Sequence, residues 1–214
     1  IKYVSEEIYI ESDIILYSVG RIPNIKDIGL ENTNIKISNN AIKVDDNLRT
    51  DEANIFAIGD CIGGPFLAHK AYYDGILAVK NILGNDLKRD YSLIPYCIFS
   101  KPEVACIGKT EEQLKLSGVK YKISKFPFSA NGKAKTIDET NGFVKILISQ
   151  PDNFILGVHI IGPNASDLIL LAQSLIKSGA NIDDLTSLIF SHPTLGESIW
   201  EAGLLLKNEG IHFG

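Results

Sequence analysis

Methionine is absent from this sequence of 214 residues, and cysteine is scarce. The three cysteines, Cys61, Cys97 and Cys106, include no CxxC pair and show no metal-ligand spacing. This pattern argues against a zinc site, and we expect no bound metal. Reduced, partly buried thiols of an intracellular protein are the simpler interpretation.

Long hydrophobic runs and an excess of basic residues are also missing. The longest apolar candidates, such as 168–176, are interrupted by polar residues, so we expect no membrane-spanning segment. A formal charge of −5 without a basic stripe argues against a nucleic-acid partner. With 45% hydrophobic and 22% charged residues, the composition is typical of a soluble globular protein with one or two cores.

The sequence does not begin with methionine. It starts at Ile1 with strand-like alternation, without a helix cap or a targeting segment. We therefore expect a fragment of a longer polypeptide whose localisation signal lies outside this sequence. The expected location is the cytoplasm, or the matrix of a mitochondrion or plastid in a eukaryote.

The most informative stretch is Ser191-His192-Pro193-Thr194-Leu195-Gly196-Glu197. Pro193 favours an extended conformation at His192, which places the imidazole in a loop before a helix. Glu197 then lies on the first turn of that helix, where its carboxylate can bend back toward the ring. A carboxylate fixes the tautomer of an imidazole and stabilises its protonated form, as a general base near neutral pH requires.

The same stretch allows a purely structural interpretation. Thr194 can be the N-cap of the helix, and Thr194-x-x-Glu197 is a capping box in which the glutamate accepts the Thr194 N–H. A single histidine before proline is also more often a turn residue than a catalyst. Taken alone, these residues leave both interpretations open.

The first part of the chain predicts a series of short strands. Its apolar residues alternate with polar ones or run together between polar turns, as in half-buried or fully buried strands. The expected strands are 8–10, 13–19, 35–37, 42–44 and 55–58. Gly20 opens the turn after the second strand, which is either an ordinary strand-ending loop or a ligand loop.

The strand at 55–58 runs into Gly59-Asp60. An acceptor-only carboxylate at the end of a strand can bind a ligand hydroxyl, although a solvated aspartate in a glycine turn is the simpler alternative. A helix is predicted from Leu67 to Leu83, with Gly84 as its stop. The amino end of that helix could face the same ligand.

A polar stretch at 81–90 marks an expected domain boundary, and the chain beyond it predicts alternating strands and helices. Strands are expected at 94–99, 103–108, 121–126, 143–148 and 154–161, and helices at 110–118, 165–178, 182–189 and 195–208. An antiparallel sheet with helices packed on one side, an α+β fold, is the natural outcome.

Six motifs in order resemble those of a known family. They are Gly-Arg-x-Pro-Asn at 20–24, the stretch 50–60 ending in Gly-Asp, Leu-Ala-His-Lys-Ala at 67–71, Lys-Pro-Glu-Val-Ala at 101–105, Phe-Pro-Phe at 126–128 followed by Ala130-Asn131, and His-Pro-Thr-Leu-x-Glu at 192–197. Nearly the whole chain is similar to the carboxyl-terminal half of the flavoprotein disulfide reductases, and most of all to their dihydrolipoyl dehydrogenase branch. Six motifs in register are far more specific than any one of them.

This resemblance implies three parts and two cofactors. The end of a nicotinamide-binding domain is expected at 1–24, the last part of an FAD-binding domain at 25–92, and a dimerisation domain at 93–214. The first two parts would be remnants of α/β domains that bind NAD and FAD. Gly20 matches the glycine that lies against the nicotinamide cofactor, and Asp60 matches the aspartate that binds the ribityl chain of the flavin.

A further segment matches the part of the family that touches the isoalloxazine ring of the flavin. It consists of Phe66, Leu67, Ala68 and His69.

The resemblance also implies a reaction. His192 matches the base that takes a proton from dihydrolipoamide, so that the thiolate attacks the enzyme's disulfide, and Glu197 matches the carboxylate that orients the base. Electrons would pass through the disulfide and FAD to NAD+, and the base of one subunit in a homodimer would serve the flavin of the other. The implied substrates are a small dithiol and the lipoyl domain of a 2-oxo acid dehydrogenase complex or of the glycine cleavage system.

Two positions depart from the family pattern. Phe190 stands where many relatives have a second histidine, and Lys101 stands where many have a histidine before Pro-Glu. Both are expected near the substrate mouth, so a related disulfide reductase of the glutathione or mercuric type stays open as an alternative.

The family's GxGxxG motif and its redox-active cysteine pair have no counterpart in this sequence, and Gly63-Gly64 does not replace them. The chain would therefore hold the base without the electron acceptor, and we expect no reductase turnover from it alone. A non-catalytic dimerisation module that folds from about residue 93 onward is the alternative from a different class.

Overall fold

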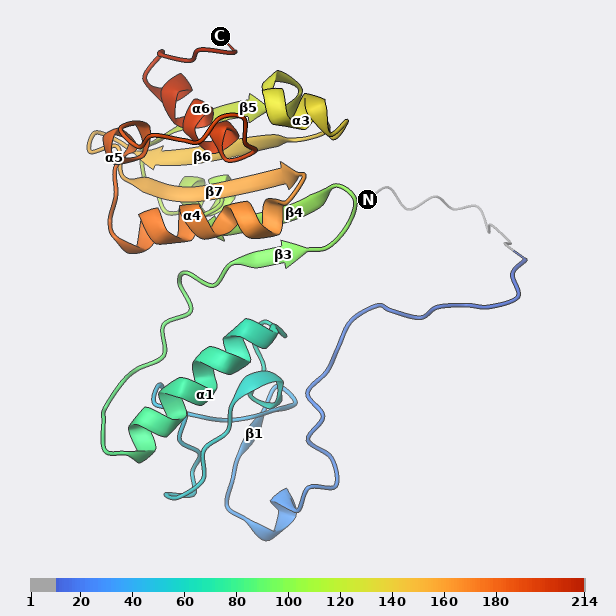
Figure 1. Cartoon of the computed structure of the whole chain (residues 1–214). Helices are drawn as coiled ribbons and strands as arrows, with labels where there is room; N and C mark the ends of the chain where they lie inside the picture. Colours follow the sequence, from blue (N-terminus) through green and yellow to red (C-terminus); the bar gives the residue numbers. More distant parts are fainter. Residues whose placement is uncertain (1–10, 214) are drawn as a thin grey trace. The chain divides into compact units, whose positions relative to one another are not determined.

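The computed structural model describes residues 11–213, and the chain divides into two compact units, residues 1–89 and 90–214. The expected strand at 8–10 lies outside the described residues. Figure 1 shows the helices and strands of both units.

The first unit is built around one helix and little sheet. Its elements are η1 (Leu30–Asn32), β1 (Ile37–Ser38), β2 (Ala41–Ile42), η2 (Gly59–Ile62) and α1 (Ala68–Ile82). β1 and β2 form a two-stranded antiparallel ribbon, which is shorter than the strands predicted at 35–37 and 42–44. A small core of Leu48, Leu77 and Ala78 joins the loops to α1.

The predicted helix from Leu67 to Leu83 is confirmed as α1. Leu67 is its N-cap and Leu83 its C-cap, and Gly84 follows with a φ of +94°. This positive φ suits glycine, because a side chain would strain the left-handed conformation that ends the helix.

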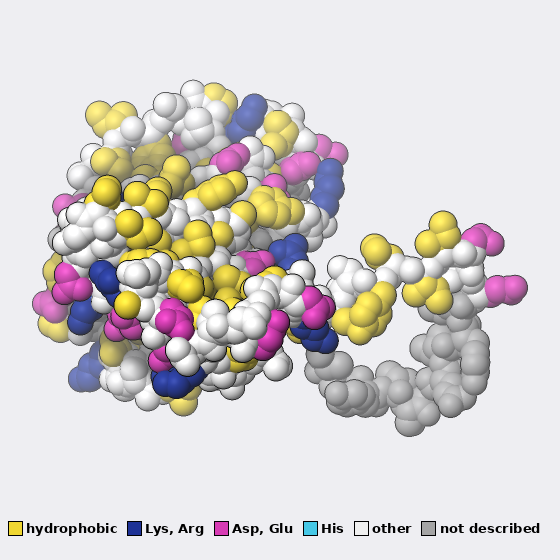
Figure 2. All heavy atoms as spheres, turned by 90° about the horizontal axis from the view of Figure 1, so that it is seen from below, with side chains coloured by type: hydrophobic (Ala, Val, Ile, Leu, Met, Phe, Trp, Pro, Cys, Tyr) yellow, Lys and Arg dark blue, Asp and Glu magenta, His cyan; other side chains and the backbone are white. Residues whose placement is uncertain are grey.

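Two predicted strands are wrong. Residues 14–17 and Val19 are 75–88% exposed and extended, and at 55–58 only Phe56 makes a single β-bridge, to Arg49. An apolar segment becomes a strand only where neighbouring backbones pair with it, and within residues 11–213 none pairs with 13–19. In Figure 2 the hydrophobic side chains of this extended segment stand without cover.

The second unit contains a five-stranded sheet, and all its neighbouring strands are antiparallel. The strand order is β3-β4-β7-β6-β5. The strands are β3 (Tyr96–Ile98), β4 (Glu103–Gly108), β5 (Tyr121–Pro127), β6 (Phe143–Ser149) and β7 (Ile155–Gly162). The helical elements are α2 (Glu111–Leu116), η3 (Phe128–Ala130), α3 (Gly132–Thr136), α4 (Ala165–Lys177), α5 (Ile182–Thr186) and α6 (Glu197–Leu206).

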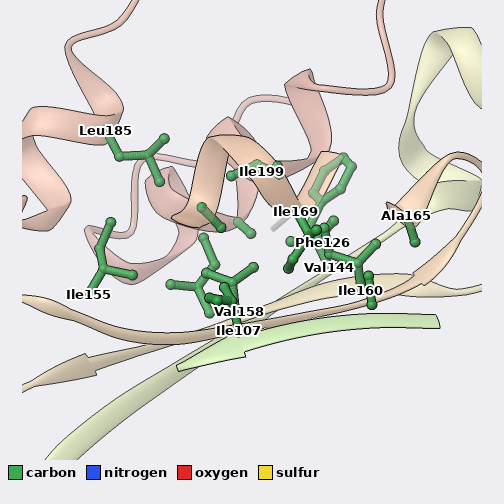
Figure 3. Close-up of a cluster of buried hydrophobic side chains, with 14 of the residues drawn as sticks. Ile107, Phe126, Val144, Ile155, Val158, Ile160, Ala165, Ile169, Leu185 and Ile199 are labelled. Atoms are coloured by element: carbon green, nitrogen blue, oxygen red, sulfur yellow. The ribbon is translucent and has the colours of Figure 1, made fainter. Parts of the chain in front are cut away.

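Two helices enclose the core of this unit against the sheet. α4 packs on β4 and β7, and α6 packs on β5 and β6. Figure 3 shows side chains from sheet and helices meeting between them, among them Val144, Ile160, Ile169 and Ile199, all buried. Together with the helix and ribbon of the first unit, this arrangement confirms the predicted α+β fold.

The local helix signals of the second unit also hold. Thr110 caps α2 by accepting the Gln113 N–H at 3.2 Å, while the Gln113 side chain accepts the Thr110 N–H at 3.0 Å. These two bonds form a capping box at the start of the predicted helix, and it needs no tertiary contact to form. Among the described residues, no helix is long and apolar enough to cross a membrane.

Replacing Ile160 by alanine tests the core of the second unit. Ile160 is fully buried between β4 and β6 on the face covered by the helices, so the change leaves a cavity. We expect the free energy of unfolding to fall by about 2–5 kcal/mol, measured by urea unfolding followed by Trp200 fluorescence. The matched change of exposed Leu116 on α2 should leave the midpoint almost unchanged, and equal losses for both variants would contradict this core.

Candidate active site

The loop from Ser191 to Gly196 bears His192 and leads into the first turn of α6. The helix begins at Glu197, and its N-cap is Gly196, which supplies no side-chain hydrogen bond. The prediction that Thr194 is the N-cap is therefore wrong. The Thr194 hydroxyl donates to the Ser191 carbonyl at 2.9 Å and is thus engaged within the loop.

The structure brings His192 and Glu197 into contact. The Nδ1 atom of His192 lies 2.8 Å from Oε1 of Glu197, and the Thr194 N–H donates to Oε2 at 2.6 Å. The Glu197 carboxylate thus makes both of the predicted contacts, one with each oxygen, although Thr194 is not the N-cap. The backbone bond fixes the carboxylate, and the fixed carboxylate orients the ring.

The hydrogen-bonding capacity of the pair determines the tautomer. An ionised carboxylate only accepts hydrogen bonds, so beside it we assign the proton of the neutral His192 ring to Nδ1, which leaves Nε2 as the acceptor nitrogen. The His192 side chain is 72% exposed, whereas that of Glu197 is only 14% exposed. The ring is thus accessible from outside, while the carboxylate that contacts it is largely shielded.

A second contact holds the loop from the side of α3. The Asn131 side chain donates from Nδ2 to the Thr194 carbonyl at 3.0 Å and accepts the Ala134 N–H at 2.9 Å. Asn131 is buried, so its amide connects the start of α3 rigidly to the loop of His192. This gives a structural reason for the Ala130-Asn131 motif.

The two positions that depart from the family pattern have structural contacts here. The ring of Phe190 lies 6.1 Å from that of Trp200, and Phe190 packs against the core. Lys101 is exposed and forms an ion pair with Glu139 at 3.2 Å, beside a shallow cavity of about 360 Å³. Phe190 is thus part of the packing behind the loop, and Lys101 is a surface charge.

The residues expected to contact the flavin lie together in the first unit. Asp60 is exposed on η2, which packs against α1. Phe66 and Leu67 precede α1, while Ala68 and His69 form its first residues. Leu67, the N-cap of α1, makes no side-chain cap hydrogen bond to the start of the helix. An exposed carboxylate beside a helix start without a side-chain cap fits a ligand that carries both hydroxyl and anionic groups, and FAD is such a ligand.

A buried ion pair fixes the turn that carries Asp60. Lys70 and Asp74 are both almost completely buried on α1, and the Lys70 Nζ atom lies 3.0 Å from Oδ2 of Asp74. Asp74 accepts the Gly59 N–H at 3.0 Å, and Lys70 donates to the Gly59 carbonyl at 3.1 Å. Gly59 has a φ of +70°, and both of its peptide groups are held by one ion pair. This pair was not predicted from the sequence, although its i, i+4 spacing is a signal for such a contact.

Gly20 lies in the exposed extended segment, with a φ of +141°. A Cβ atom at this position would meet no other atom within 4 Å in the described structure. The residues around Gly20 do not form a nicotinamide site by themselves.

The cysteines do not form a dithiol centre. Cys97 and Cys106 lie on paired strands, but the register places Cys97 opposite Ala105 and Cys106 opposite Tyr96, so the two side chains point to opposite faces. Burial raises the pKa of both thiols, which keeps them protonated and weakly nucleophilic. Residues 11–213 also contain no cluster of three or more His, Cys, Asp or Glu side chains suited to a metal ion.

Comparison with known proteins assigns the family. Residues 94–203 match the dimerisation domain of the pyridine nucleotide-disulphide oxidoreductases, and residues 3–75 match a second domain of the same family. The chain belongs to the pyridine nucleotide-disulphide oxidoreductase family, and His192, Glu197 and Asn131 all lie within its dimerisation domain.

Several curated proteins similar to this chain are dihydrolipoyl dehydrogenases. The mitochondrial enzyme of Caenorhabditis elegans is 46% identical over 196 residues, which cover 91% of this chain and 40% of that protein. The enzyme of Geobacillus stearothermophilus is 44% identical over 204 residues, covering 95% of this chain and 43% of that protein. The chain thus spans less than half the length of these relatives.

Solved structures agree with this assignment. LpdA from Mycobacterium tuberculosis matches with a TM-score of 0.80 and 29% identity, over 86% of this chain and 41% of its own. A Cu(II) complex of the HOCl-induced flavoprotein disulfide reductase RclA from Escherichia coli matches with a TM-score of 0.84 and 26% identity, over 88% of this chain and 44% of its own.

Replacing Asp74 by alanine tests the turn of Asp60. The change breaks a buried ion pair and removes the acceptor of the Gly59 N–H, so we expect a local loss of about 3–5 kcal/mol. Hydrogen exchange of residues 55–82 should become faster in this variant. Replacing Asp51, whose ion pair with Lys36 is at the surface, is the control and should leave that exchange unchanged. Unchanged exchange in the Asp74 variant would contradict the proposed fixation of the turn.

Proposed function

We propose that this chain is the carboxyl-terminal part of a homodimeric dihydrolipoyl dehydrogenase, which oxidises dihydrolipoamide and passes the electrons through a disulfide and FAD to NAD+. The observation that carries this proposal is the contact between His192 and Glu197 at 2.8 Å, in a chain of this family whose similar relatives bear that name. Residues 1–24 would end the nicotinamide-binding domain, 25–92 would complete the FAD-binding domain, and 93–214 would form the dimer.

His192 would act as the general base. Its Nε2 atom accepts the proton of a dithiol S–H group, and the thiolate that forms is the species able to attack a disulfide. Glu197 keeps the Nδ1 proton in place and balances the charge of the imidazolium. Thr194 and Asn131 hold the carboxylate and the loop, so that the ring is positioned before the substrate arrives.

FAD would supply the acceptor of the electron pair when it is bound. Of this chain, Asp60 would hold a hydroxyl of its ribityl chain, and the segment from Phe66 to His69 would lie at its ring system. The buried Lys70–Asp74 pair would keep the Asp60 turn in place for that contact. Gly20 would belong to the part of the enzyme that holds NAD, which would supply the final electron acceptor when bound.

The partners follow from the same assignment. A second copy of the chain would complete the site, since the base of one subunit serves the flavin of the other in this family. The dithiol would arrive as a small molecule or on the lipoyl domain of a 2-oxo acid dehydrogenase complex or the glycine cleavage system. The relatives include bacterial and mitochondrial enzymes, so the cytoplasm or an organelle matrix is the proposed location.

A chimeric enzyme tests the proposal. In the Geobacillus stearothermophilus relative, the stretch that aligns with this chain is replaced by this chain, so the rest of the polypeptide supplies the disulfide and the missing cofactor domains. We expect NAD+ reduction by dihydrolipoamide, and His192→Gln should lower its turnover by about 10²–10⁴-fold, the usual contribution of a general base. NADH formation is followed by its absorbance.

Two controls sharpen this assay. His159→Gln changes a histidine on β7 that is bonded to the Lys109 carbonyl at 3.1 Å, and it should leave turnover unchanged. The chain alone should reduce no NAD+. A His192→Gln chimera as active as its parent, or turnover by the isolated chain, would contradict the proposal.

A further inference from the structure

A second imidazole–carboxylate pair lines the cavity behind His192. Glu201 lies one helical turn after Glu197 on α6 and is only 1% exposed. Its Oε1 atom lies 2.5 Å from Nδ1 of His212, and its Oε2 atom accepts the Ile211 N–H at 3.1 Å. The carboxylates of Glu197 and Glu201 therefore follow the same pattern: each contacts one imidazole nitrogen and accepts one backbone N–H.

The two pairs face one cavity of about 150 Å³. The titratable groups in its wall are Lys135 from α3, His192 from the loop, Glu197 and Glu201 from α6, and His212 from the carboxyl-terminal segment. Two carboxylates one helical turn apart lie close enough to share a cationic partner. The two carboxylates can therefore compete for the same cationic side chain in the cavity wall.

The carboxyl-terminal segment delivers His212 to this position. The chain turns back after α6 at Asn208, which has a φ of +60°, and the Glu209 N–H donates to the Leu204 carbonyl at 2.9 Å. The ring of Phe213 meets that of Phe126 edge to face, with centroids 6.2 Å apart. His212 is thereby held against Glu201 by contacts on both sides of it.

A buried carboxylate without a partner is expensive. Desolvation of the charge costs several kcal/mol unless a partner and further hydrogen bonds compensate for it, and apolar residues often replace a buried ion pair without loss of stability. Without His212, the Glu201 carboxylate would keep only the Ile211 N–H. The other cationic or hydrogen-bond-donating side chains in the cavity wall include His192 and Lys135.

We propose that His212 is a positioning residue for the base. By pairing with Glu201, His212 keeps the Glu201 carboxylate from competing with Glu197 for the His192 ring. The catalytic consequence rests on the proposed function of His192, whereas the effect on the His192 ring does not. The sequence analysis gave His212 no role, because nothing local to residue 212 indicates a contact with residue 201.

Two variants of the full chain that differ only in one charge test this inference. H212L leaves the Glu201 carboxylate without its imidazole. E201Q/H212L loses the same ring contact, but the neutral amide can still accept the Ile211 N–H. The chain is labelled with ¹⁵N-histidine, and ring ¹H–¹⁵N correlations give the tautomer of His192, assigned with the H192Q chain.

We expect the ratio of the Nδ1–H to the Nε2–H tautomer of His192 to fall by a factor of about 2–100 in H212L, the range for neighbours within one hydrogen-bond network. E201Q/H212L should return the ratio to that of the unchanged chain. In the chimera, we expect turnover to fall in H212L and to return in E201Q/H212L. An unchanged ratio in H212L, or equal ratios in both variants, would overturn the inference, because a purely structural loss of the segment affects both alike.

The comparison stays informative in two difficult cases. Should H212L not fold, H212S and E201Q/H212S give the same contrast with a smaller apolar change. Should the chimera show no dithiol-dependent turnover with an unchanged His192, the proposed function fails, while the tautomer ratios still decide whether His212 positions the ring.

Discussion

The carboxylate of Glu197 makes the two hydrogen bonds on which the candidate site depends. One oxygen holds the ring of His192, and the other holds the Thr194 N–H in the loop that bears this ring. Because Glu197 is the first residue of α6, the position of the ring is tied to the position of the helix. The His192 ring is therefore only as rigidly placed as α6 is packed on the sheet.

That packing is secured by polar and apolar contacts along the helix. Ser124 on β5 donates to the Ala202 carbonyl at 2.5 Å, and the Trp200 indole donates to the Thr186 carbonyl at 3.0 Å. Ile199 is buried among the side chains that the sheet presents to the helices. Buried polar contacts of this kind fix one orientation of the helix, whereas apolar contacts alone tolerate small rotations. The position of the His192 ring thus depends on the antiparallel sheet on which α6 packs.

The sequence predicts most of the second unit because its signals are local. The capping box at Thr110, the alternation along β6 and β7, and the glycine after α1 each act within a few residues. The contact of Glu197 with His192 is also local, since five positions separate the two. Thr194 is not the N-cap, because α6 begins only after Gly196 and the Thr194 hydroxyl donates to the Ser191 carbonyl within the loop.

What the sequence did not predict depends on residues far apart in the chain. The apolar segments 13–19 and 55–58 have the pattern of strands, but strand formation needs paired neighbours that residues 11–213 do not provide. The clamp of Lys70 and Asp74 on Gly59 and the return of His212 to Glu201 join elements through turns whose course no local pattern sets. Spacing alone could have suggested only the Lys70–Asp74 pair.

The most direct test of this account is the ring tautomer of His192 in the unchanged full chain near neutral pH, read from ¹H–¹⁵N correlations of the labelled histidines. The account predicts a proton on Nδ1, held by Glu197, and an unprotonated Nε2 in the neutral ring. A neutral ring that carries its proton on Nε2 would contradict it, because such a ring offers Glu197 no donor and the substrate no base.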